Sequence, residues 1–242
     1  MAKVIVIIGA SGGIGRALVN ACMRRYPQSR IHALSRSGFR EPGWNEQVEC
    51  YPVDTGDEPS IAAWVTQNLG SADTVSIAVC TVGVLHDAPD WGPEKKLEDV
   101  NTTQMEHYFR VNTLVPALWM KHLLGYMEPQ RSVLACLSAR VGSISDNRLG
   151  GWYGYRASKA ALNMMIKTAA VEYRRRSENT VLLAYHPGTV DTGLSQPFQS
   201  RVPADKLFST DFTAECLLTI IERLTPEQSP AYLDWQGQPI DW

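Results

Sequence analysis

Tyr155 and Lys159 are the two residues of this sequence whose types and spacing best fit an acid–base site. They lie in the segment Tyr-Gly-Tyr-Arg-Ala-Ser-Lys that ends at Lys159, which we expect to be helical. Residues four apart lie on one face of a helix, so the phenol and the ammonium would be neighbours. A nearby cation favours the phenolate and lowers the pKa of the phenol from its ordinary value of about 10. The pair is therefore a candidate for proton transfer near neutral pH.

A glycine-rich segment near the N-terminus is a candidate dinucleotide site. It follows a strand predicted at Lys3–Ile8 and opens an amphipathic helix that reaches about Arg25. Glycines let the backbone turn tightly and approach a pyrophosphate, which faces the helix N-terminus. The glycine spacing fits either Gly-x-x-x-Gly-x-Gly or Gly-x-x-Gly-x-x-Gly and does not choose between them. The residues expected to contact the cofactor here are Gly9, Ser11, Gly12, Gly13, Ile14 and Gly15.

The end of the second predicted strand, Arg30–Ser35, carries a cation where many dinucleotide sites carry an acid. Ser35 and Arg36 stand at this end, and no acidic residue is present. An acidic residue there would bind the ribose hydroxyls, whereas a basic one can bind a 2′-phosphate. We therefore predict that NADP(H) is favoured over NAD(H). The alternative is that Arg36 is a solvated loop charge.

Strands and helices alternate along the rest of the chain. The third predicted strand, Val48–Val53, ends at Asp54 and Thr55, where Asp54 either contacts the adenine or caps the next helix. Further strands are predicted at Thr74–Cys80, Val133–Leu137, Thr180–Tyr185 and Ala231–Trp235, and further helices at Glu58–Leu69, Thr103–Tyr126, Tyr155–Arg176 and Asp211–Leu224. This alternation is typical of a parallel sheet covered on both faces, with ligands at the carboxyl ends of its strands. We predict an α/β fold, a Rossmann-type doubly wound parallel sheet of about seven strands, in a single domain over residues 1–242.

The predicted helix Thr103–Tyr126 contains a polar residue, Asn112, among apolar ones. An Asn in such a position usually satisfies a neighbouring backbone group. The core candidates on this helix are Phe109, Val111, Leu114, Leu118 and Leu123. The segment after the sixth strand, as far as Phe208, looks like a loop or short helix over the site.

Composition and charge exclude several classes of function. A formal charge of −2 gives no electrostatic bias toward nucleic acid or an anionic membrane. The five cysteines are widely spaced and form no Cys/His cluster, so we expect free thiols in a reducing compartment and no metal. No apolar stretch approaches the roughly 20 residues of a membrane span, and a strand from Lys3 leaves no room for a signal peptide. We therefore expect a cytoplasmic protein that acts on small molecules.

Taken together, these features resemble the short-chain dehydrogenase/reductase family over essentially the whole chain. The markers, in order, are Gly9 to Gly15, Asp54, Gly83, Asn112, a serine-containing end of the fifth strand, Tyr155-x-x-x-Lys159, and Pro187-Gly-x-Val-x-Thr192. The length and the Gly-Ile-Gly sequence resemble the classical branch. The stretch from Ser143 to Lys159 resembles the carbonyl-reductase-like group that includes the sniffer and C-factor proteins.

The resemblance implies hydride transfer between a nicotinamide and a carbonyl or alcohol carbon. Tyr155 would be the general acid or base, Lys159 would lower its pKa and hold the nicotinamide ribose, and Asn112 would support a water relay. The remaining cofactor contacts that the resemblance implies are Gly83, Pro187, Gly188, Val190 and Thr192. It also implies a homodimer or homotetramer built partly on the helices that carry Asn112 and Tyr155.

Two alternatives to this function stay open. A C-factor-like signalling protein could use the fold only to sense the cofactor, with little or no turnover. The retained Tyr155, Lys159 and Asn112 favour catalysis, because a sensor needs no proton donor. An epimerase or dehydratase on the same fold is disfavoured by the length of the chain.

The sequence departs from the family pattern at two places. The turn after the fourth strand reads Cys-Thr-Val-Gly, ending at Gly83, where the family usually has Asn-Asn-Ala-Gly. Alignment through Gly142 puts Ala139 at the position of the catalytic serine and Ser138 one residue earlier. A shift of one residue on a strand turns the side chain to the other face. We take Ser138 as the first candidate for the catalytic hydroxyl and Ser143 as the second, and the third possibility is that no hydroxyl takes part.

Overall fold

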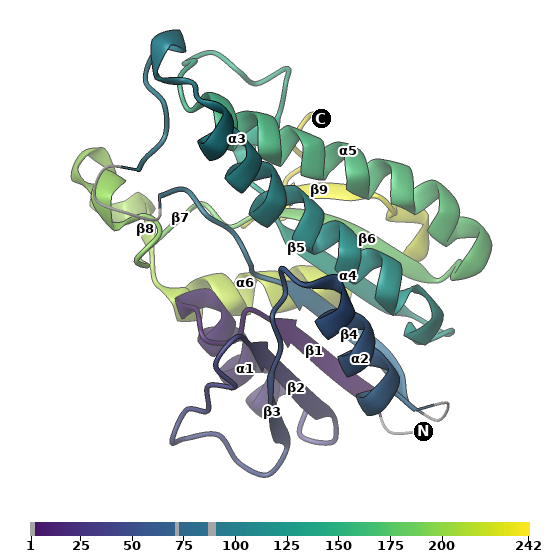
Figure 1. Ribbon diagram of the computed structural model, residues 1–242. Helices are drawn as coiled ribbons and strands as arrows, with labels where there is room; N and C mark the ends of the chain where they lie inside the picture. The colour runs from purple at the N-terminus through teal and green to yellow at the C-terminus, as the bar shows by residue number, and fades with distance from the viewer. Residues whose placement is uncertain (1–2, 71–72, 87–90) are drawn as a thin grey trace.

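Seven parallel strands form the central sheet of the computed structural model, which describes residues 3–70, 73–86 and 91–242 (Figure 1). The strands are β1 Lys3–Ile8, β2 Arg30–Ser35, β3 Val48–Pro52, β4 Thr74–Cys80, β5 Ser132–Leu137, β6 Thr180–His186 and β9 Ala231–Asp234. Their order across the sheet is β3-β2-β1-β4-β5-β6-β9. Most of these strands are buried almost throughout, which explains their continuous apolar sequences. The predicted α/β fold with a doubly wound parallel sheet is confirmed.

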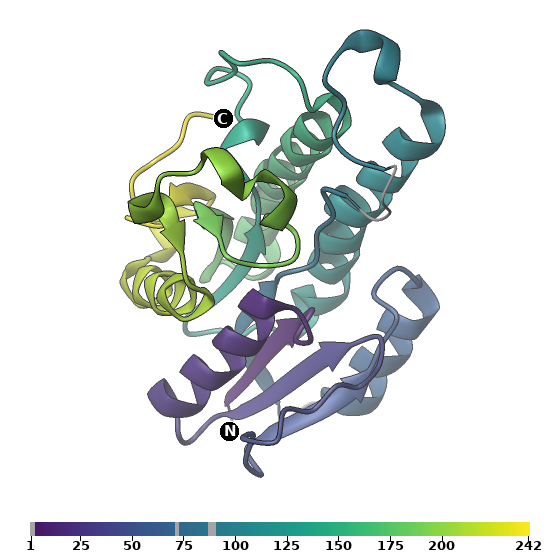
Figure 2. The same ribbon diagram turned by 90° about the vertical axis from the view of Figure 1, so that its left-hand side faces the viewer.

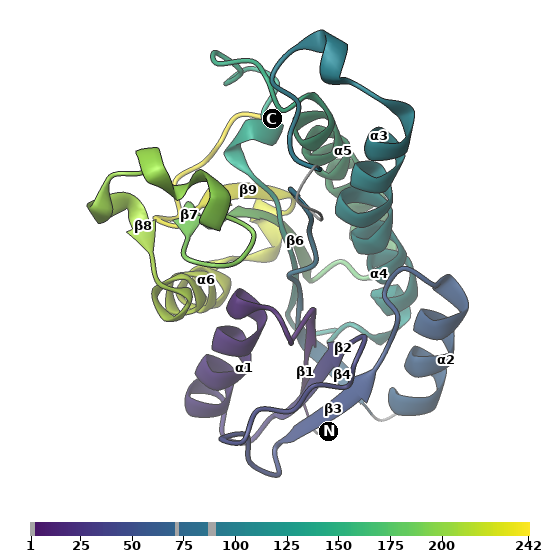
Figure 3. The ribbon, with the colours of Figure 1, turned by 60° about the vertical axis from the view of Figure 1, so that its left-hand side comes forward.

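Helices cover both faces of the sheet (Figures 1 and 3). On one face lie α1 Gly13–Arg25 and α6 Thr210–Arg223, which bury Leu18 and Leu217 against the sheet. On the other lie α2 Glu58–Asn68, α4 Val115–Leu123 and α5 Tyr153–Arg176, which contribute Trp64, Trp119 and Ile166 to a second core. No helix in the described part of the chain is long and apolar enough to cross a membrane.

The helix predicted at Thr103–Tyr126 is interrupted by a π-helical turn. It consists of α3 Thr102–Phe109, the π turn Arg110–Leu114 and α4, followed by a short 3₁₀ turn. The extra residue of a π turn rotates the faces before and after it relative to one another. The predicted core face is consequently wrong in part: Leu123 is buried, but Leu114 is 55% exposed and the buried residues include Tyr108, Val115 and Trp119.

The segment between β6 and α6 contains two short strands and two 3₁₀ turns. β7 Thr189–Val190 pairs with β8 Leu207–Phe208, and the turns span Gln196–Arg201 and Ala204–Lys206. Figure 2 shows this segment in light green above α6. Gly193 and Leu194 of this segment line the pocket described below, so it contributes to one wall of the predicted site.

All five cysteines are free thiols, as expected from their spacing. Cys22, Cys80 and Cys136 are buried, and Cys50 and Cys216 are partly buried. Burial raises the pKa of the Cys80 thiol to about 11, so this side chain behaves as a small apolar group in the core.

Candidate active site and cofactor pocket

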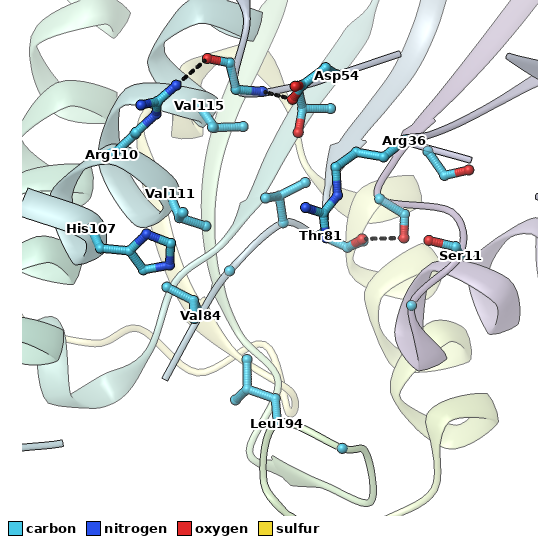
Figure 4. Close-up of a pocket in the computed structure, with 18 of the residues that line it drawn as sticks. Ser11, Arg36, Asp54, Thr81, Val84, His107, Arg110, Val111, Val115 and Leu194 are labelled. Atoms are coloured by element: carbon cyan, nitrogen blue, oxygen red, sulfur yellow. Dashed lines mark hydrogen bonds between the residues drawn. The ribbon is translucent and has the colours of Figure 1, made fainter. Parts of the chain in front are cut away.

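A cavity of about 700 Å³ lies at the carboxyl ends of the strands, where the strand order reverses between β1 and β4 (Figure 4). This switch point is where doubly wound sheets bind ligands. Eight of the predicted cofactor residues line it: Gly9, Ser11, Gly12, Ser35, Arg36, Asp54, Thr55 and Gly83. The lining residues that were not predicted are Gly56, Thr81, Val82, Val84, His86, His107, Arg110, Val111, Val115, Gly193 and Leu194. Many of these directly flank predicted residues, so proximity in the sequence could have indicated them.

Close packing requires glycine at the first and last positions of the glycine turn. Gly9 has a φ of +90°, and a Cβ there would lie 2.6 Å from the Thr81 hydroxyl. A Cβ on Gly15 would collide with the carbonyl oxygen of Gly9. α1 begins after Gly12 without a side-chain cap or an acidic residue in its first turn. The first amides of α1 are therefore free to bind an anion.

Thr81 explains how the unusual turn after β4 is held. Its hydroxyl lies 2.9 Å from the carbonyl oxygen of Ile8. It also lies 3.2 Å from the carbonyl oxygen of Gly9, a contact drawn as a dashed line in Figure 4. The end of β4 is thereby tied to the glycine turn. This contact supports the turn in a sequence that lacks the usual Asn-Asn-Ala-Gly.

Arg36 and Asp54 both line the pocket (Figure 4). Arg36 is exposed, and no carboxylate in the described part of the chain pairs with it. Asp54 accepts a hydrogen bond from the Gly56 amide at 2.9 Å. The cap of α2 is Asp57, which accepts from the Ser60 amide at 3.0 Å, so the alternative that Asp54 caps this helix is wrong.

Tyr155 and Lys159 lie on one face of α5, as their spacing predicts. The Lys159 ammonium is 5.8 Å from the centre of the Tyr155 ring and donates to the carbonyl oxygen of Leu137 at 2.8 Å. Burial lowers the pKa of Lys159 to about 8. Burial, followed by the phenols of Tyr108 and Tyr232, raises the pKa of Tyr155 above its ordinary value. The expectation that Lys159 lowers this pKa is therefore not met in this structure, in which burial is the largest influence on the phenol. The phenol is a proton-bearing group at neutral pH.

Asn112 lies in the π turn and is fully buried. Its side chain accepts from the Val84 amide at 2.8 Å and donates to the Val84 carbonyl oxygen at 3.0 Å and to the Ser158 hydroxyl at 3.1 Å. A Cβ on Gly83 would lie 3.4 Å from Asn112 Oδ1 and 3.5 Å from Lys159 Nζ. Asn112 thus fixes the loop after β4 beside Lys159, which agrees with the structural interpretation of this residue.

The hydroxyls of both serine candidates form hydrogen bonds with other parts of the protein. Ser138 Oγ donates to Asn163 Oδ1 at 2.6 Å, one helical turn beyond Lys159. Ser143 Oγ lies 3.4 Å from the Ser145 hydroxyl and accepts from the Asp146 amide at 3.2 Å. Ala139 instead belongs to the apolar cluster that contains Tyr155. The choice of Ser138 as the catalytic hydroxyl stays a prediction, and in this structure its hydroxyl is bonded to Asn163.

Aromatic rings surround Tyr155. Its ring centre is 6.2 Å from that of Tyr108 and 6.1 Å from that of Trp152. Phe198, from the turn Gln196–Arg201, lies 5.2 Å from Trp152. Trp91 lies 4.9 Å from Tyr108. Val84 belongs to this cluster and also lines the cavity, so the cluster adjoins the cavity, although Tyr155 and Lys159 are not among the lining residues.

Glu94 supports the start of α5 and was missed by the sequence analysis. Only 2% of it is exposed, and its carboxylate accepts from the Gly154 amide at 3.1 Å. α5 has no side-chain cap of its own and no acid in its first turn, so this carboxylate supplies the negative charge that a helix N-terminus favours. A Cβ on Gly154 would collide with the Tyr108 ring and lie 2.8 Å from Glu94 Oε1. Sixty residues separate Glu94 from Gly154, so no local pattern could indicate the contact.

The residues predicted after β6 lie outside the cavity lining, and Thr192 is the one among them that lies against the glycine turn in the described part of the chain. Gly188 has a φ of +75°, and a Cβ there would lie 2.6 Å from the Phe208 ring. A Cβ on Gly13 would lie 3.2 Å from Thr192 Cγ2. Thr192 therefore reaches the start of α1, and the buried Val190 holds this segment to β8. Pro187, Ile14 and Gly15 also lie outside the lining.

A parallel sheet with a glycine turn at its switch point defines a dinucleotide-binding fold. Residues 3–202 match the family model described as short chain dehydrogenase. The chain belongs to this family of oxidoreductases, as the resemblance implied.

Several known proteins are similar to this chain. The C-signal protein of Myxococcus xanthus is 34% identical over 147 residues, which are 60% of this chain and 83% of that protein. The benzil reductase of Bacillus subtilis that forms (S)-benzoin is 22% identical over 241 residues, or 92% and 95% of the two chains. The NADPH-bound carbonyl reductase from chicken fatty liver has a TM-score of 0.82 at 21% identity, covering 100% of this chain and 99% of that one.

Proposed function

We propose that this protein is an NADP(H)-dependent carbonyl reductase in which Tyr155 is the proton donor. The observation that carries the proposal is the placement of Tyr155 and Lys159 on one face of α5, beside the cavity that begins at the glycine turn. A Cβ on the lining residue Gly83 would lie 3.5 Å from Lys159 Nζ, and the lining residue Val84 belongs to the cluster that contains Tyr155. A buried, protonated phenol beside an ammonium is suited to donate to a developing alkoxide. The similarity to benzil reductase and to a carbonyl reductase supports a carbonyl substrate.

The residues present fit a nicotinamide dinucleotide. Gly9 and Gly15 leave the N-terminal amides of α1 accessible to a pyrophosphate. Arg36, a cation without a carboxylate partner among the described residues, would hold a 2′-phosphate. Asp54 and Thr55 would contact the adenosine, and Lys159 would hold the nicotinamide ribose. NADPH in the carbonyl reductase of similar fold supports this choice of cofactor.

The chain's own part in the reaction is positioning and proton transfer. When bound, the reduced nicotinamide would supply a hydride, so that the carbonyl carbon gains two electrons and one hydrogen. Tyr155 would give its hydroxyl proton to the carbonyl oxygen and recover a proton from water. Lys159, held by the Leu137 carbonyl oxygen, would stabilise the phenolate that forms.

Steady-state oxidation of NADPH with a panel of aldehydes, quinones and ketones tests this proposal. Tyr155→Phe keeps the ring and removes only the proton donor, so turnover should fall by roughly 10²- to 10⁴-fold while the Kd for NADPH stays the same. Substantial turnover by Tyr155→Phe would reject Tyr155 as the acid.

The similarity to the C-signal protein favours one second candidate, a cofactor-sensing signalling role. A sensor would bind NADPH at the same glycine turn without needing Tyr155. Tight NADPH binding with no oxidation across the whole panel would favour this candidate over the reductase.

A further inference from the structure

Arg110 is a cation of the cofactor cavity to which neither the fold nor the proposed reaction gives a role. It begins the π turn between α3 and α4, and its side chain lines the cavity (Figure 4). Arg110 Nη2 donates to the carbonyl oxygen of Gly56 at 3.4 Å, which is long for a hydrogen bond and is the one such bond of this side chain within the described part of the chain. A guanidinium has several N–H donors and is always charged. Most donors of Arg110 are therefore available to a ligand.

The guanidinium of Arg110 lies between two open spaces. A second cavity, of about 530 Å³, shares Gly56, Arg110 and Val115 with the cofactor cavity. The side chain is exposed, and among residues 3–70, 73–86 and 91–242 no carboxylate forms an ion pair with it. Neither close packing nor an ion pair holds the guanidinium, so it can turn toward a group bound in the cofactor cavity.

Arg110 and Arg36 stand on opposite sides of the cofactor cavity (Figure 4). Arg36 lies on the side of Ser11 and the glycine turn, whereas Arg110 lies on the side of Val111 and Val115. The 2′-phosphate is proposed to bind on the side of Arg36. Arg110 therefore faces a different part of the cofactor.

Gly56 connects Arg110 to Asp54, the residue proposed to contact the adenosine. The Gly56 amide donates to Asp54 Oδ1 at 2.9 Å, while its carbonyl oxygen accepts from Arg110 (Figure 4). The other carboxylate oxygen of Asp54 has no hydrogen bond to the described residues, so it can accept from an amino group. A donor and an acceptor thus lie at the same end of the cavity.

The walls near Arg110 are apolar. Val82 comes from the loop after β4, and Val111 and Val115 come from the π turn and α4. All three line the cavity that Arg110 and Asp54 border. A purine has flat apolar faces and a polar edge, which fits these walls and their charged rim.

We propose that the Arg110 guanidinium packs on the adenine ring of the cofactor and holds the base beside Asp54. This inference rests on the proposed dinucleotide-dependent function. A guanidinium is planar and weakly hydrated, so it stacks on aromatic faces, and its charge attracts the π electrons. NADPH and NADH carry the same base, so Arg110 contributes equally to the binding of both. Arg36, by contrast, chooses between them.

Dissociation constants of NADPH and NADH, measured by titration against the fluorescence of the reduced nicotinamide, test the inference. Arg110→Ala should weaken the binding of both cofactors by the same factor, roughly three- to tenfold. Arg175→Ala removes the same charge from an exposed position of α5 and should change neither constant. Because Arg110 is exposed, its substitution should leave the urea midpoint unchanged.

Two further variants separate stacking from charge. Arg110→Lys keeps the charge and loses the plane, so it should bind both cofactors about as weakly as Arg110→Ala. Arg110→Tyr supplies a flat ring without a charge and should restore both constants to within about twofold of wild type. Full recovery in Arg110→Lys without recovery in Arg110→Tyr would overturn the stacking.

Competition with cofactor fragments locates the contact. Adenosine 5′-monophosphate carries the base, and nicotinamide mononucleotide lacks it. The inhibition constant of the adenosine fragment against NADPH should rise in Arg110→Ala by the same factor as the Kd of NADPH. That of the nicotinamide fragment should not change, and an equal rise for both fragments would contradict a contact with the base.

Failure of the inference and failure of the function give different results. A loss in Arg110→Ala for NADPH but not for NADH would show that Arg110 binds the phosphate, and the inference would be wrong. Unchanged binding of both cofactors by Arg110→Ala would also overturn it, while the dinucleotide function would stand. If wild type binds neither NADPH nor NADH, the proposed function is wrong and the inference falls with it.

Discussion

Lys159→Met should abolish turnover and yet change stability in a direction that depends on pH. The Lys159 ammonium is buried, and this burial lowers its pKa from 10.5 to about 8. A lysine whose pKa is lower in the folded state binds fewer protons when folded between about pH 8 and 10.5. Its unfavourable contribution to the free energy of unfolding is therefore complete below about pH 8 and disappears as the pH rises toward 10.5. A shift of this size corresponds to roughly 3 kcal/mol.

Methionine has a similar length and no charge, so the variant lacks this pH-dependent cost. It also leaves the Leu137 carbonyl oxygen without its partner, which costs about 1–3 kcal/mol at every pH. The two effects nearly cancel at pH 7, whereas at pH 9.5 the lost hydrogen bond dominates. The free energy of unfolding of wild type relative to Lys159→Met should therefore rise by roughly 2 kcal/mol between pH 7 and pH 9.5.

Urea denaturation of both proteins at the two pH values measures this change. Lys167→Met, at an exposed position on the same helix, is the matched control and should give a pH-independent difference. A difference between wild type and Lys159→Met that stays constant from pH 7 to pH 9.5 would refute the reasoning. It would mean that the buried ammonium keeps its ordinary pKa.

Three further predictions concern the cofactor, the start of α5 and assembly. Arg36→Ala should weaken NADPH binding by about tenfold and leave NADH binding unchanged. This factor is at the lower end for a charge-assisted contact, because Arg36 is exposed. Arg175→Ala on α5 is the control, and equal affinities of wild type for NADH and NADPH would contradict the assignment. Gly154→Ala should lower the free energy of unfolding by about 1–3 kcal/mol, because the added Cβ meets Tyr108 and Glu94. Gly125→Ala, where the added Cβ enters open space, should leave it unchanged. Equal urea midpoints for the two variants would argue against close packing around Gly154. Wild type should be a homo-oligomer that uses α4 and α5. Met164→Glu should convert it to a monomer, since Met164 is 62% exposed on α5. Light scattering that finds wild type monomeric at micromolar concentration would rule the oligomer out.

The strands could be predicted largely because the sheet is parallel and buried on both faces. Such strands are continuous apolar runs, and β2 and β4 begin and end at the predicted residues. The glycine turn was also predictable, because Gly9 and Gly15 are required by backbone contacts that follow from a strand–turn–helix connection. The π turn at Arg110–Leu114 was not, since no side-chain period marks a single extra residue.

The candidate site was predictable where it depends on local geometry and not where it depends on distant contacts. Four-residue spacing placed Lys159 beside Tyr155, but the pKa of Tyr155 depends on burial by the rings of other elements. The direction of the Ser138 hydroxyl depends on Asn163, which only the packing of β5 on α5 brings near. Glu94 reaches Gly154 across the tertiary structure.

The transfer of isotope from labelled cofactor to product tests the central claim most directly. Wild-type protein supplied with NADPH deuterated at the reactive nicotinamide carbon and with each carbonyl compound of the panel should yield, from at least one of them, an alcohol with one deuterium on the former carbonyl carbon, detected by mass spectrometry. Tyr155→Phe should bind the same cofactor with unchanged Kd and yield almost no labelled alcohol. Cofactor binding without deuterium transfer by the wild type, or equal transfer by Tyr155→Phe, would contradict the account.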